Sequence, residues 1–202
     1  MAVALRERQL RLREDAILEA ALGLFVERGY AGATMDELAA RLGTSKRTLY
    51  QHFPSKEDVA VSLIVRAMRL ALEALDAGGP EVPAIDRIAA LLRAGIERRQ
   101  ELRAVLIMPL PVGVRDHPRY RAQLAQVRDR LAAVVAEAQA AGDVDPALSA
   151  PVVGALLQGI VRERHDDVLR SGLATVDELR DTILAVVLRG LRPGRAPPAA
   201  AP

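Results

Sequence analysis

The strongest constraint on this fold is a pair of short helices predicted between residues 34 and 53. The run Thr34–Glu37 has the spacing of a capping box, in which a threonine hydroxyl and a glutamate carboxylate bond the free amides of a helix start. Gly43 ends that helix, Ser45 is the next candidate N-cap, and Pro54 stops the second helix because proline lacks an amide donor. Two short helices joined by a glycine-containing turn predict a helix-turn-helix.

Composition and periodicity predict helices for the rest of the chain as well. Of its 202 residues 50% are hydrophobic, with alanine, leucine and valine dominant, and alternating strand-forming residues are missing. We therefore expect an all-α protein, with further helices at residues 8–28, 56–76, 83–96, 102–108, 116–141, 145–169 and 175–188. Asp116 and Thr175 are the expected N-caps of two of these helices, and the Pro/Ala-rich residues 193–202 are expected to be disordered.

Basic charge is concentrated in two short segments near the start of the chain. Residues 1–13 carry four arginines and one glutamate, and residues 41–56 carry four basic residues and no acid. Residues 57–202 hold 19 charges of each sign, so their charges sum to zero. Such local positive charge is typical of a surface that binds a polyanion, and a solvated helix face is the alternative.

The expected helix at residues 46–52 carries side chains that suit a DNA groove. Leu49 and Phe53 are four residues apart and are expected to face inward, which leaves the opposite face of the helix free. The major groove of a duplex admits one helix, whose polar side chains then reach base edges and phosphates. The segment offers Ser45, Lys46, Arg47, Thr48, Gln51 and His52 for such contacts.

This region resembles the DNA-binding domain of the TetR family of bacterial transcriptional regulators, over residues 11–72. The resemblance rests on the run ILxAAxxLFxxxGY at residues 17–30, on the Thr34 cap, and on the Ser45–Glu57 run SKxxLYxHFxSKE. It implies phosphate contacts by Thr34, Tyr50 and Lys56, and groove contacts by Lys46, Arg47, Thr48, Gln51 and His52, with Arg47 and Gln51 reading bases. The basic residues Arg6, Arg8, Arg11 and Arg13 either follow the DNA backbone or minor groove, or have no function.

The resemblance also implies two domains and a mode of regulation. Residues 11–71 would be the DNA-binding domain, with its motif at residues 34–53, and residues 72–192 a helical effector-binding and dimerisation domain. The expected protein is a homodimeric repressor of a palindromic operator in double-stranded DNA, released by a small-molecule effector. A regulator gated by a protein partner, or one that is not gated at all, is the alternative.

The regulatory half offers weaker signals for its two expected sites. Only Tyr120 among the five aromatic residues lies beyond residue 53, so an effector pocket would be largely aliphatic and its ligand largely apolar. The candidate pocket residues, which are otherwise simple core, are Met68, Leu92, Ile96, Leu106, Met108, Tyr120 and Leu124. The family places the dimer contact on the last two helices, here through Gly154, Leu157, Ile160, Ile183 and Val187, with packing inside the chain as the alternative.

Other classes of protein fit the sequence poorly. Without cysteine there is no disulfide scaffold, thiolate metal site or cysteine nucleophile. The three histidines lie far apart and no nucleophile motif or glycine-rich phosphate loop occurs, so we expect no enzyme, cofactor or metal. The longest uncharged run, Val105–Val114, contains two prolines and cannot span a bilayer, and Met1–Leu5 is too short for a signal peptide. We therefore expect a cytoplasmic protein without a membrane partner.

Overall fold

A computed structural model of the protein describes residues 2–76, 79–101, 111–162 and 166–194. This described part of the chain is helical and contains no strand, which confirms the all-α prediction. Residue contacts divide the chain into two compact units. We call Met1–Met68 with Arg99–Gln123 the N-terminal unit, and Arg69–Arg98 with Leu124–Pro202 the C-terminal unit.

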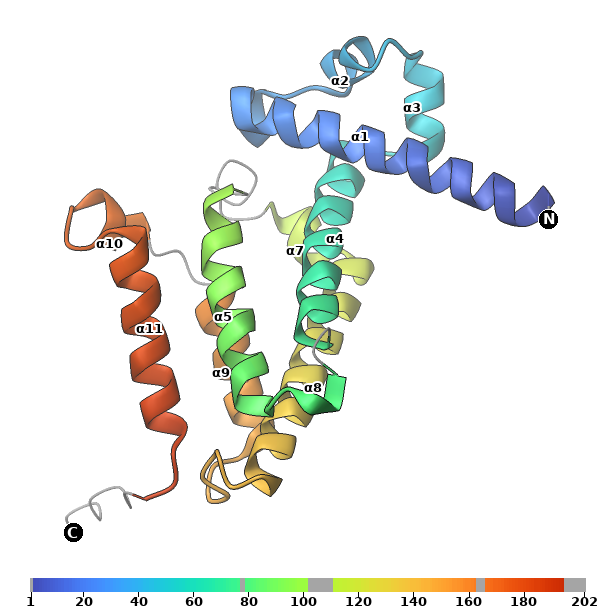
Figure 1. Ribbon diagram of the computed structural model, residues 1–202. Coiled ribbons are helices and arrows are strands. Elements are labelled where there is room, and N and C mark those ends of the chain that lie inside the picture. Colours follow the sequence, from blue (N-terminus) through green and yellow to red (C-terminus); the bar gives the residue numbers. More distant parts are fainter. Residues whose placement is uncertain (1, 77–78, 102–110, 163–165, 195–202) are drawn as a thin grey trace. The chain divides into compact units, whose positions relative to one another are not determined.

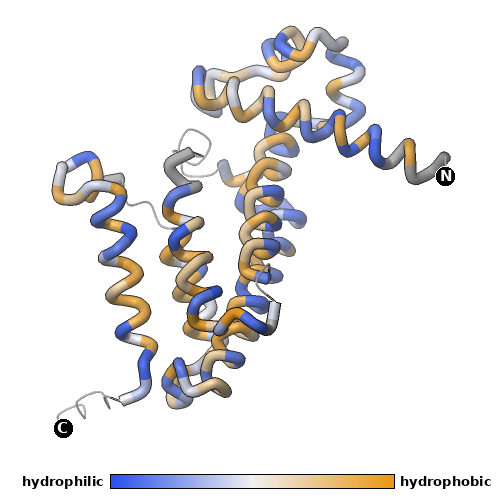
Figure 2. Tube along the Cα trace, viewed as in Figure 1, coloured by the Kyte–Doolittle hydropathy of each residue, from blue (hydrophilic) through white to orange (hydrophobic). Residues whose placement is uncertain are grey.

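Figure 1 shows the helices under the labels used below. Their bounds are α1 (Ala2–Gly32), α2 (Met35–Arg41), α3 (Lys46–His52), α4 (Lys56–Asp76), the 3-10 turn η1 (Gly79–Glu81), α5 (Ala84–Glu101), α7 (Val112–Asp116), α8 (Pro118–Ala140), α9 (Ala150–Arg162), α10 (Asp166–Arg170) and α11 (Val176–Leu191). Hydrophobic and hydrophilic stretches alternate along α4, α5, α8 and α11 (Figure 2), as they do in helices that bury one face.

The helix ends of the N-terminal unit follow the sequence predictions closely. In the capping box of α2, Glu37 N donates to Thr34 Oγ1 at 3.2 Å, and Thr34 N donates to Glu37 Oε2 at 3.0 Å. Ser45 caps α3 because its Oγ accepts a hydrogen bond from Thr48 N at 3.1 Å. Gly29 interrupts α1 with a φ of 69°, a left-handed conformation that glycine adopts without steric strain.

A small apolar core orients α3 within the N-terminal unit. Helix α2 packs on both α1 and α3. Phe25 on α1, Leu38 on α2 and Leu49 on α3 are almost completely buried, and Phe53 at the end of α3 is buried as well. Burying one such side chain contributes roughly 1.5–3 kcal/mol, so this core decides which face of α3 stays outside.

The C-terminal unit comprises α9, α10, α11, most of α5 and α8, and the last turns of α4. Its most deeply buried side chains include Leu75, Ile88, Leu92, Leu131, Val134 and Leu157. Gly154 on α9 approaches α8 so closely that an added Cβ would lie 2.8 Å from the backbone N of Ala132. The two helices can approach this closely because glycine has no side chain.

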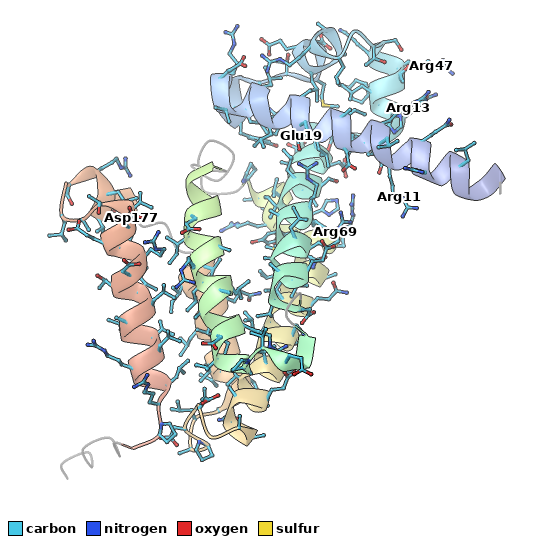
Figure 3. All side chains as sticks on the ribbon, viewed as in Figure 1. Arg11, Arg13, Glu19, Arg47, Arg69 and Asp177 are labelled. Atoms are coloured by element: carbon cyan, nitrogen blue, oxygen red, sulfur yellow. The ribbon has the colours of Figure 1, made fainter. Side chains whose placement is uncertain are left out.

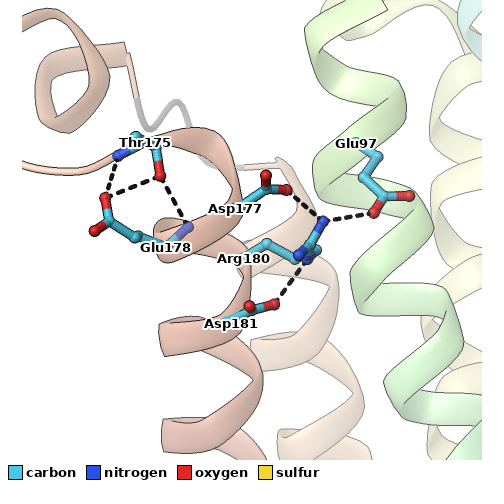
Figure 4. A network of polar contacts seen from close by, with 6 residues as sticks. All are labelled: Glu97, Thr175, Asp177, Glu178, Arg180 and Asp181. Atoms are coloured by element: carbon cyan, nitrogen blue, oxygen red, sulfur yellow. Dashed lines mark hydrogen bonds and ion pairs between the residues drawn. The ribbon is translucent and has the colours of Figure 1, made fainter.

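Ion pairs connect the polar faces of helices in the C-terminal unit. Arg180 on α11 donates to Glu97 on α5 at 3.0 Å, and it also donates to Asp177 and Asp181 on its own helix (Figure 4). These hydrogen bonds, the one to Asp181 first, raise the pKa of Arg180 above its usual value. The capping box of α11, in which Glu178 N donates to Thr175 Oγ1 at 3.2 Å, confirms the predicted start of that helix.

Two helix starts expected from the sequence were wrong. Asp116 ends α7 instead of capping the next helix, and His117 takes that place because its Nδ1 accepts from Arg119 N at 3.2 Å. Asp145 does not begin a helix, since its Oδ1 accepts from Ala147 N at 2.8 Å and closes a turn, and α9 begins at Ala150. The error at Asp145 arises because a short aspartate side chain bonds a nearby amide in turns as readily as at helix starts.

Three further expectations concern the extent of the helices. The first helix begins at Ala2, six residues before the predicted Arg8, and the last helix continues to Leu191. The helix expected at residues 102–108 and most of the tail at residues 193–202 lie outside the described residues. Within the described ranges, no helix combines the length and the apolar character needed to cross a membrane.

Candidate nucleic-acid interface

Two apolar side chains and the two ends of the helix set the orientation of α3. Leu49 is 0% exposed, and Phe53, the C-cap residue, is 5% exposed. Phe53 N donates to Leu49 O at 2.9 Å, which closes the last turn directly before Pro54. Because Leu49 points into the core, residues on the other sides of this two-turn helix face solvent.

The residues predicted to contact DNA are accessible to different degrees. The exposed residues are Thr34, Ser45, Lys46, Arg47, Tyr50 and Gln51, and the half-buried ones are Thr48, His52 and Lys56. Tyr50 is 45% exposed, so its ring lies at the surface and leaves its hydroxyl accessible. All nine belong to the N-terminal unit, and their contacts with DNA stay predictions.

Three of these residues already use their hydroxyl groups inside the protein. Thr34 Oγ1 accepts from Glu37 N and donates to Glu37 Oε2 at 2.9 Å. The hydroxyls of Ser45 and Thr48 lie 2.8 Å apart and share one hydrogen bond. A hydroxyl oxygen has two lone pairs, so these groups shape the helix starts while keeping some capacity to bond a phosphate or a base.

The two cations at the start of α3 differ in their surroundings. Lys46 Nζ donates to Asp36 Oδ2 at 2.5 Å, and both side chains are exposed. This ion pair joins α3 to α2 and neutralises part of the lysine charge. Arg47 is exposed and has no carboxylate partner among the described residues, so its full charge faces solvent. Figure 3 shows Arg47 on the outer side of α3.

Lys56 has a structural role that the sequence analysis missed. Its Nζ donates to the backbone carbonyls of Tyr30 at 2.8 Å and Ala33 at 2.9 Å, with Ala31 O at 3.5 Å. An ammonium group has three hydrogens, and these carbonyls take up that capacity. Lys56 therefore satisfies the free carbonyls at the end of α1 and fixes the entry into α2. Separations of 23 to 26 residues explain why no local sequence signal could indicate these contacts.

Tyr30 forms the apolar support for this lysine. The Lys56 ammonium lies 4.6 Å from the centre of the Tyr30 ring, and the Phe25 ring centre lies 5.4 Å from it. Burial, together with the Glu57 carboxylate, raises the pKa of Tyr30 to about 12. The phenol therefore stays neutral at physiological pH and presents a face to the cation.

The predicted effector-pocket residues are distributed over both units. Leu92, Ile96 and Leu124 belong to the C-terminal unit, where the first two are buried and Leu124 is half-buried. Met68 and Tyr120 belong to the N-terminal unit, and Tyr120 is 4% exposed. Leu106 and Met108 lie outside the described residues. The pocket itself stays a prediction.

The predicted dimer contact needs a correction. Gly154 and Leu157 are buried inside their own unit, Gly154 against α8, so they are unavailable to a second copy. The alternative reading, packing inside the chain, holds for these two residues. The reason is the rotation of α9, which turns this side of the helix toward α8. Ile160, Ile183 and Val187 are half-buried and stay predictions.

A different side of α9 and α11 exposes large apolar groups. Val152 and Leu156 on α9 are 56% and 62% exposed, and Val186 on α11 is 67% exposed. The sequence could not separate these residues from their buried neighbours, because α9 is apolar on most of its circumference.

A polar connection between α4 and the α7–α8 junction also escaped the sequence analysis. His117 Nε2 lies 3.3 Å from Asp58 Oδ1, and Ser55 Oγ donates to Asp58 Oδ2 at 2.6 Å. One turn further along α4, Arg119 donates to Ser62 Oγ at 3.1 Å. Because His117 Nδ1 accepts a hydrogen bond, its proton is assigned to Nε2, directed at Asp58. The first turns of α4, which directly follow α3, are thus attached to the start of α8.

Among the described residues, no three histidine, aspartate or glutamate side chains gather closely enough to hold a metal ion.

Comparisons with known proteins agree with this geometry. Residues 17–63 match the model of the bacterial regulatory proteins of the tetR family. Over 77 residues, 37% of this chain and 34% of its relative, the chain is 40% identical to the HTH-type transcriptional regulator TcmR of Streptomyces glaucescens. Over 94 residues, 46% of this chain and 37% of its relative, it is 37% identical to the HTH-type transcriptional activator FasR of Mycolicibacterium smegmatis. The matches thus span about a third of the length of these relatives.

Solved structures share the fold over most of the chain. The regulator FadR from Bacillus subtilis, in complex with stearoyl-CoA, superposes with a TM-score of 0.71 at 18% identity, over 87% of this chain and 98% of that one. AibR, in complex with isovaleryl coenzyme A and operator DNA, superposes with a TM-score of 0.61 at 23% identity, over 86% and 97% of the two chains. At these identities the likeness shows the fold alone.

Proposed function

We propose that this chain is a regulator of the TetR family, a dimer whose two α3 helices bind successive major grooves of an operator. The observation that carries the proposal is the outward polar face of α3, held in place by Leu49 and Phe53. The family match at residues 17–63 covers this helix and its support. The relatives are transcriptional regulators, and we propose no catalytic role for the chain.

The candidate DNA-contacting residues divide into a base-reading group on α3 and a positioning group that includes residues outside α3. Arg47 and Gln51 read base edges, because a guanidinium pairs with guanine and a carboxamide with adenine through two hydrogen bonds each. Thr34 and Tyr50 bond phosphates and set the register of the helix on the duplex. Lys56 acts through its hold on the end of α1 and so positions the reading helix.

The remaining predicted residues complete the groove contact. Lys46, released from Asp36 or shared with it, adds positive charge next to Arg47. Ser45, Thr48 and His52 supply shorter donors and acceptors on the same helix.

We propose repression that is relieved by a largely apolar effector, and we name acyl-coenzyme A thioesters as its class. FadR and AibR, which share this fold, were solved with stearoyl-CoA and with isovaleryl coenzyme A. The aliphatic side chains of Leu92, Ile96 and Leu124 in the C-terminal unit suit an acyl chain, because a hydrocarbon gains most from leaving water against such groups.

Dimerisation is assigned to the exposed apolar side of α9 and α11. Val152, Leu156 and Val186 are exposed in the single chain, and burying them against a second copy would remove that apolar area from water. A two-fold contact of this kind brings the same two helices of each subunit together in a four-helix arrangement.

Effector binding would reach α3 through α4. Asp58 and Ser62, in the first two turns of α4, are bonded to His117 and Arg119 at the start of α8. Helix α8 continues into the C-terminal unit, so a displacement of α8 would move the helix that directly follows α3.

The DNA-binding part is tested by selecting genomic fragments with the purified full chain and measuring the affinity of the best fragment against a scrambled duplex. Specific binding should lose about 5- to 160-fold for each half-site on Arg47→Ala, equivalent to roughly 1–3 kcal/mol per subunit, and the loss should depend on one base position in each half-site. Equal affinity of the wild-type chain for both duplexes would refute the proposal.

The effector part is tested by repeating the measurement with isovaleryl-CoA and stearoyl-CoA. One of the two should weaken binding to the selected duplex, while free coenzyme A should not. If no acyl-CoA changes the affinity, the acyl-CoA proposal is wrong, and gating by a protein partner or no gating takes its place.

A further inference from the structure

Unpaired cations of the N-terminal unit occur on α1 as well as on α3. Arg8, Arg11 and Arg13 are exposed, and none of them has a carboxylate partner within the described part of the chain. Two other arginines of this unit are paired, Arg41 with Glu27 and Arg66 with Glu19.

The positions along α1 separate these arginines into two sides. Asp15 and Glu19 both face Arg66 on α4, so the row of residues that contains them marks the α4 side of α1. At 100° per residue, Arg8 and Arg11 continue that row, because they lie seven and four residues before Asp15. These two arginines therefore lie on the side of α1 that faces α4.

Arg13 lies on the opposite side. It is two residues from Arg11 and so about 200° around the helix from it. Figure 3 shows Arg13 on the side of α1 where α3 and Arg47 lie, with Arg11 pointing away from them. Two unpaired guanidinium groups from different helices, Arg13 and Arg47, thus belong to one side of the N-terminal unit.

The acidic groups of α2 do not cancel this pair of charges. On α2, the Asp36 carboxylate is paired with Lys46, and the Glu37 carboxylate accepts hydrogen bonds from Thr34. A polyanion that meets α3 would therefore find Arg13 uncompensated at the edge of the same surface. The exposure of the neighbouring residues Leu10 and Leu12, 49% and 61%, leaves this part of α1 open to a partner.

We propose that Arg13 is a further DNA contact, which binds a backbone phosphate next to the groove entered by α3. This inference rests on the proposed function and adds to it a positioning residue outside the helix-turn-helix. A single arginine on a phosphate contributes affinity without sequence preference, and its signature is a change in salt dependence. Arg11, of the same type and on the same helix but on the other side, should make no such contact.

The test compares Arg13→Gln with Arg11→Gln on the selected operator duplex over a range of salt concentrations. Each phosphate contact adds about 0.9 to the slope of log affinity against log salt, so a symmetric dimer of Arg13→Gln should lose about 1.8. Between 50 and 200 mM salt, this difference changes the ratio of wild-type to variant affinity by about 12-fold. Arg13→Lys should keep most of the slope, and Arg11→Gln should keep all of it.

Three outcomes would overturn the inference. An unchanged slope for Arg13→Gln would exclude the phosphate contact, and equal losses for Arg11→Gln and Arg13→Gln would show only a general effect of charge. Binding of anionic lipid vesicles that depends on Arg13, without any effect on the operator, would assign the surface to a membrane instead. Failure of the proposed function looks different, because the wild-type chain would then bind the operator and a scrambled duplex equally.

Discussion

Substitutions of Lys46 and Lys56, the two lysines of this chain, should distinguish a cation that stabilises the fold from one that binds DNA. Lys56→Met removes the hydrogen bonds to Tyr30 O and Ala33 O, at 2.8 and 2.9 Å, and the contact with the Tyr30 ring. A hydrogen bond from a charged donor contributes about 1.5–3 kcal/mol, and a partly exposed cation–π contact about 0.5–1 kcal/mol.

The magnitude follows from the position of Lys56 at the rim of the core. Its side chain is half-buried, so water recovers part of the lost bonding and the lower end of each range applies. We expect Lys56→Met to lower the free energy of unfolding by about 3 kcal/mol. For a chain of 202 residues this corresponds to a decrease in Tm of about 6–12 °C.

Lys46→Met is the matched control. Lys46 forms an exposed ion pair with Asp36, and such pairs contribute about 0–1 kcal/mol, so Tm should fall by no more than about 4 °C. Its effect should instead appear in operator binding, as a smaller dependence of the affinity on salt.

The assay is thermal unfolding followed by circular dichroism, combined with operator binding at several salt concentrations for both variants. Binding is measured below the unfolding transition of each variant, so that only folded protein contributes. An unchanged Tm for Lys56→Met, together with a salt slope reduced by about 0.9 per subunit, would refute the structural role and support the phosphate contact expected from the sequence.

Three further predictions concern the C-terminal unit. Gly154→Val should lower the free energy of unfolding in urea by about 1–3 kcal/mol, because its Cβ would meet Ala132 N at 2.8 Å, whereas Gly159→Val on the same helix, with nothing within 4 Å, should not. Leu156→Glu should shift the proposed dimer toward monomer in sedimentation equilibrium without loss of helical signal, and an unchanged dimer would exclude this side of α9 as the contact. Hydrogen bonds from Arg130 and then from Arg87 lower the pKa of Glu137. The contribution of Glu137 to the free energy of unfolding is therefore fully present above its usual pKa of 4.5, and it is lost as the pH falls through the lowered pKa. In urea unfolding at several pH values, Glu137→Gln should show a smaller loss of stability in acid than the wild-type chain.

Features that depend on neighbours a few residues apart were predictable from the sequence. The two capping boxes, at Thr34 and Thr175, and the Ser45 cap each join residues three positions apart, so the residue types alone indicate them. The helix end at Gly29 and the stop at Pro54 follow from backbone chemistry in the same way. Together with the inward positions of Leu49 and Phe53, these signals located the candidate DNA-binding helix and its outward side chains.

The sequence by itself therefore determined α2 and α3 and the residues that α3 offers to a partner. Only the tertiary structure decided that Lys56 bonds carbonyls more than twenty residues away, that Gly154 faces α8, and that Arg13 rather than Arg11 lies on the α3 side of α1. The physical reason is that helical periodicity gives the relative directions of side chains on one helix, whereas the packing of distant segments decides which of those directions is buried and which charge finds a partner.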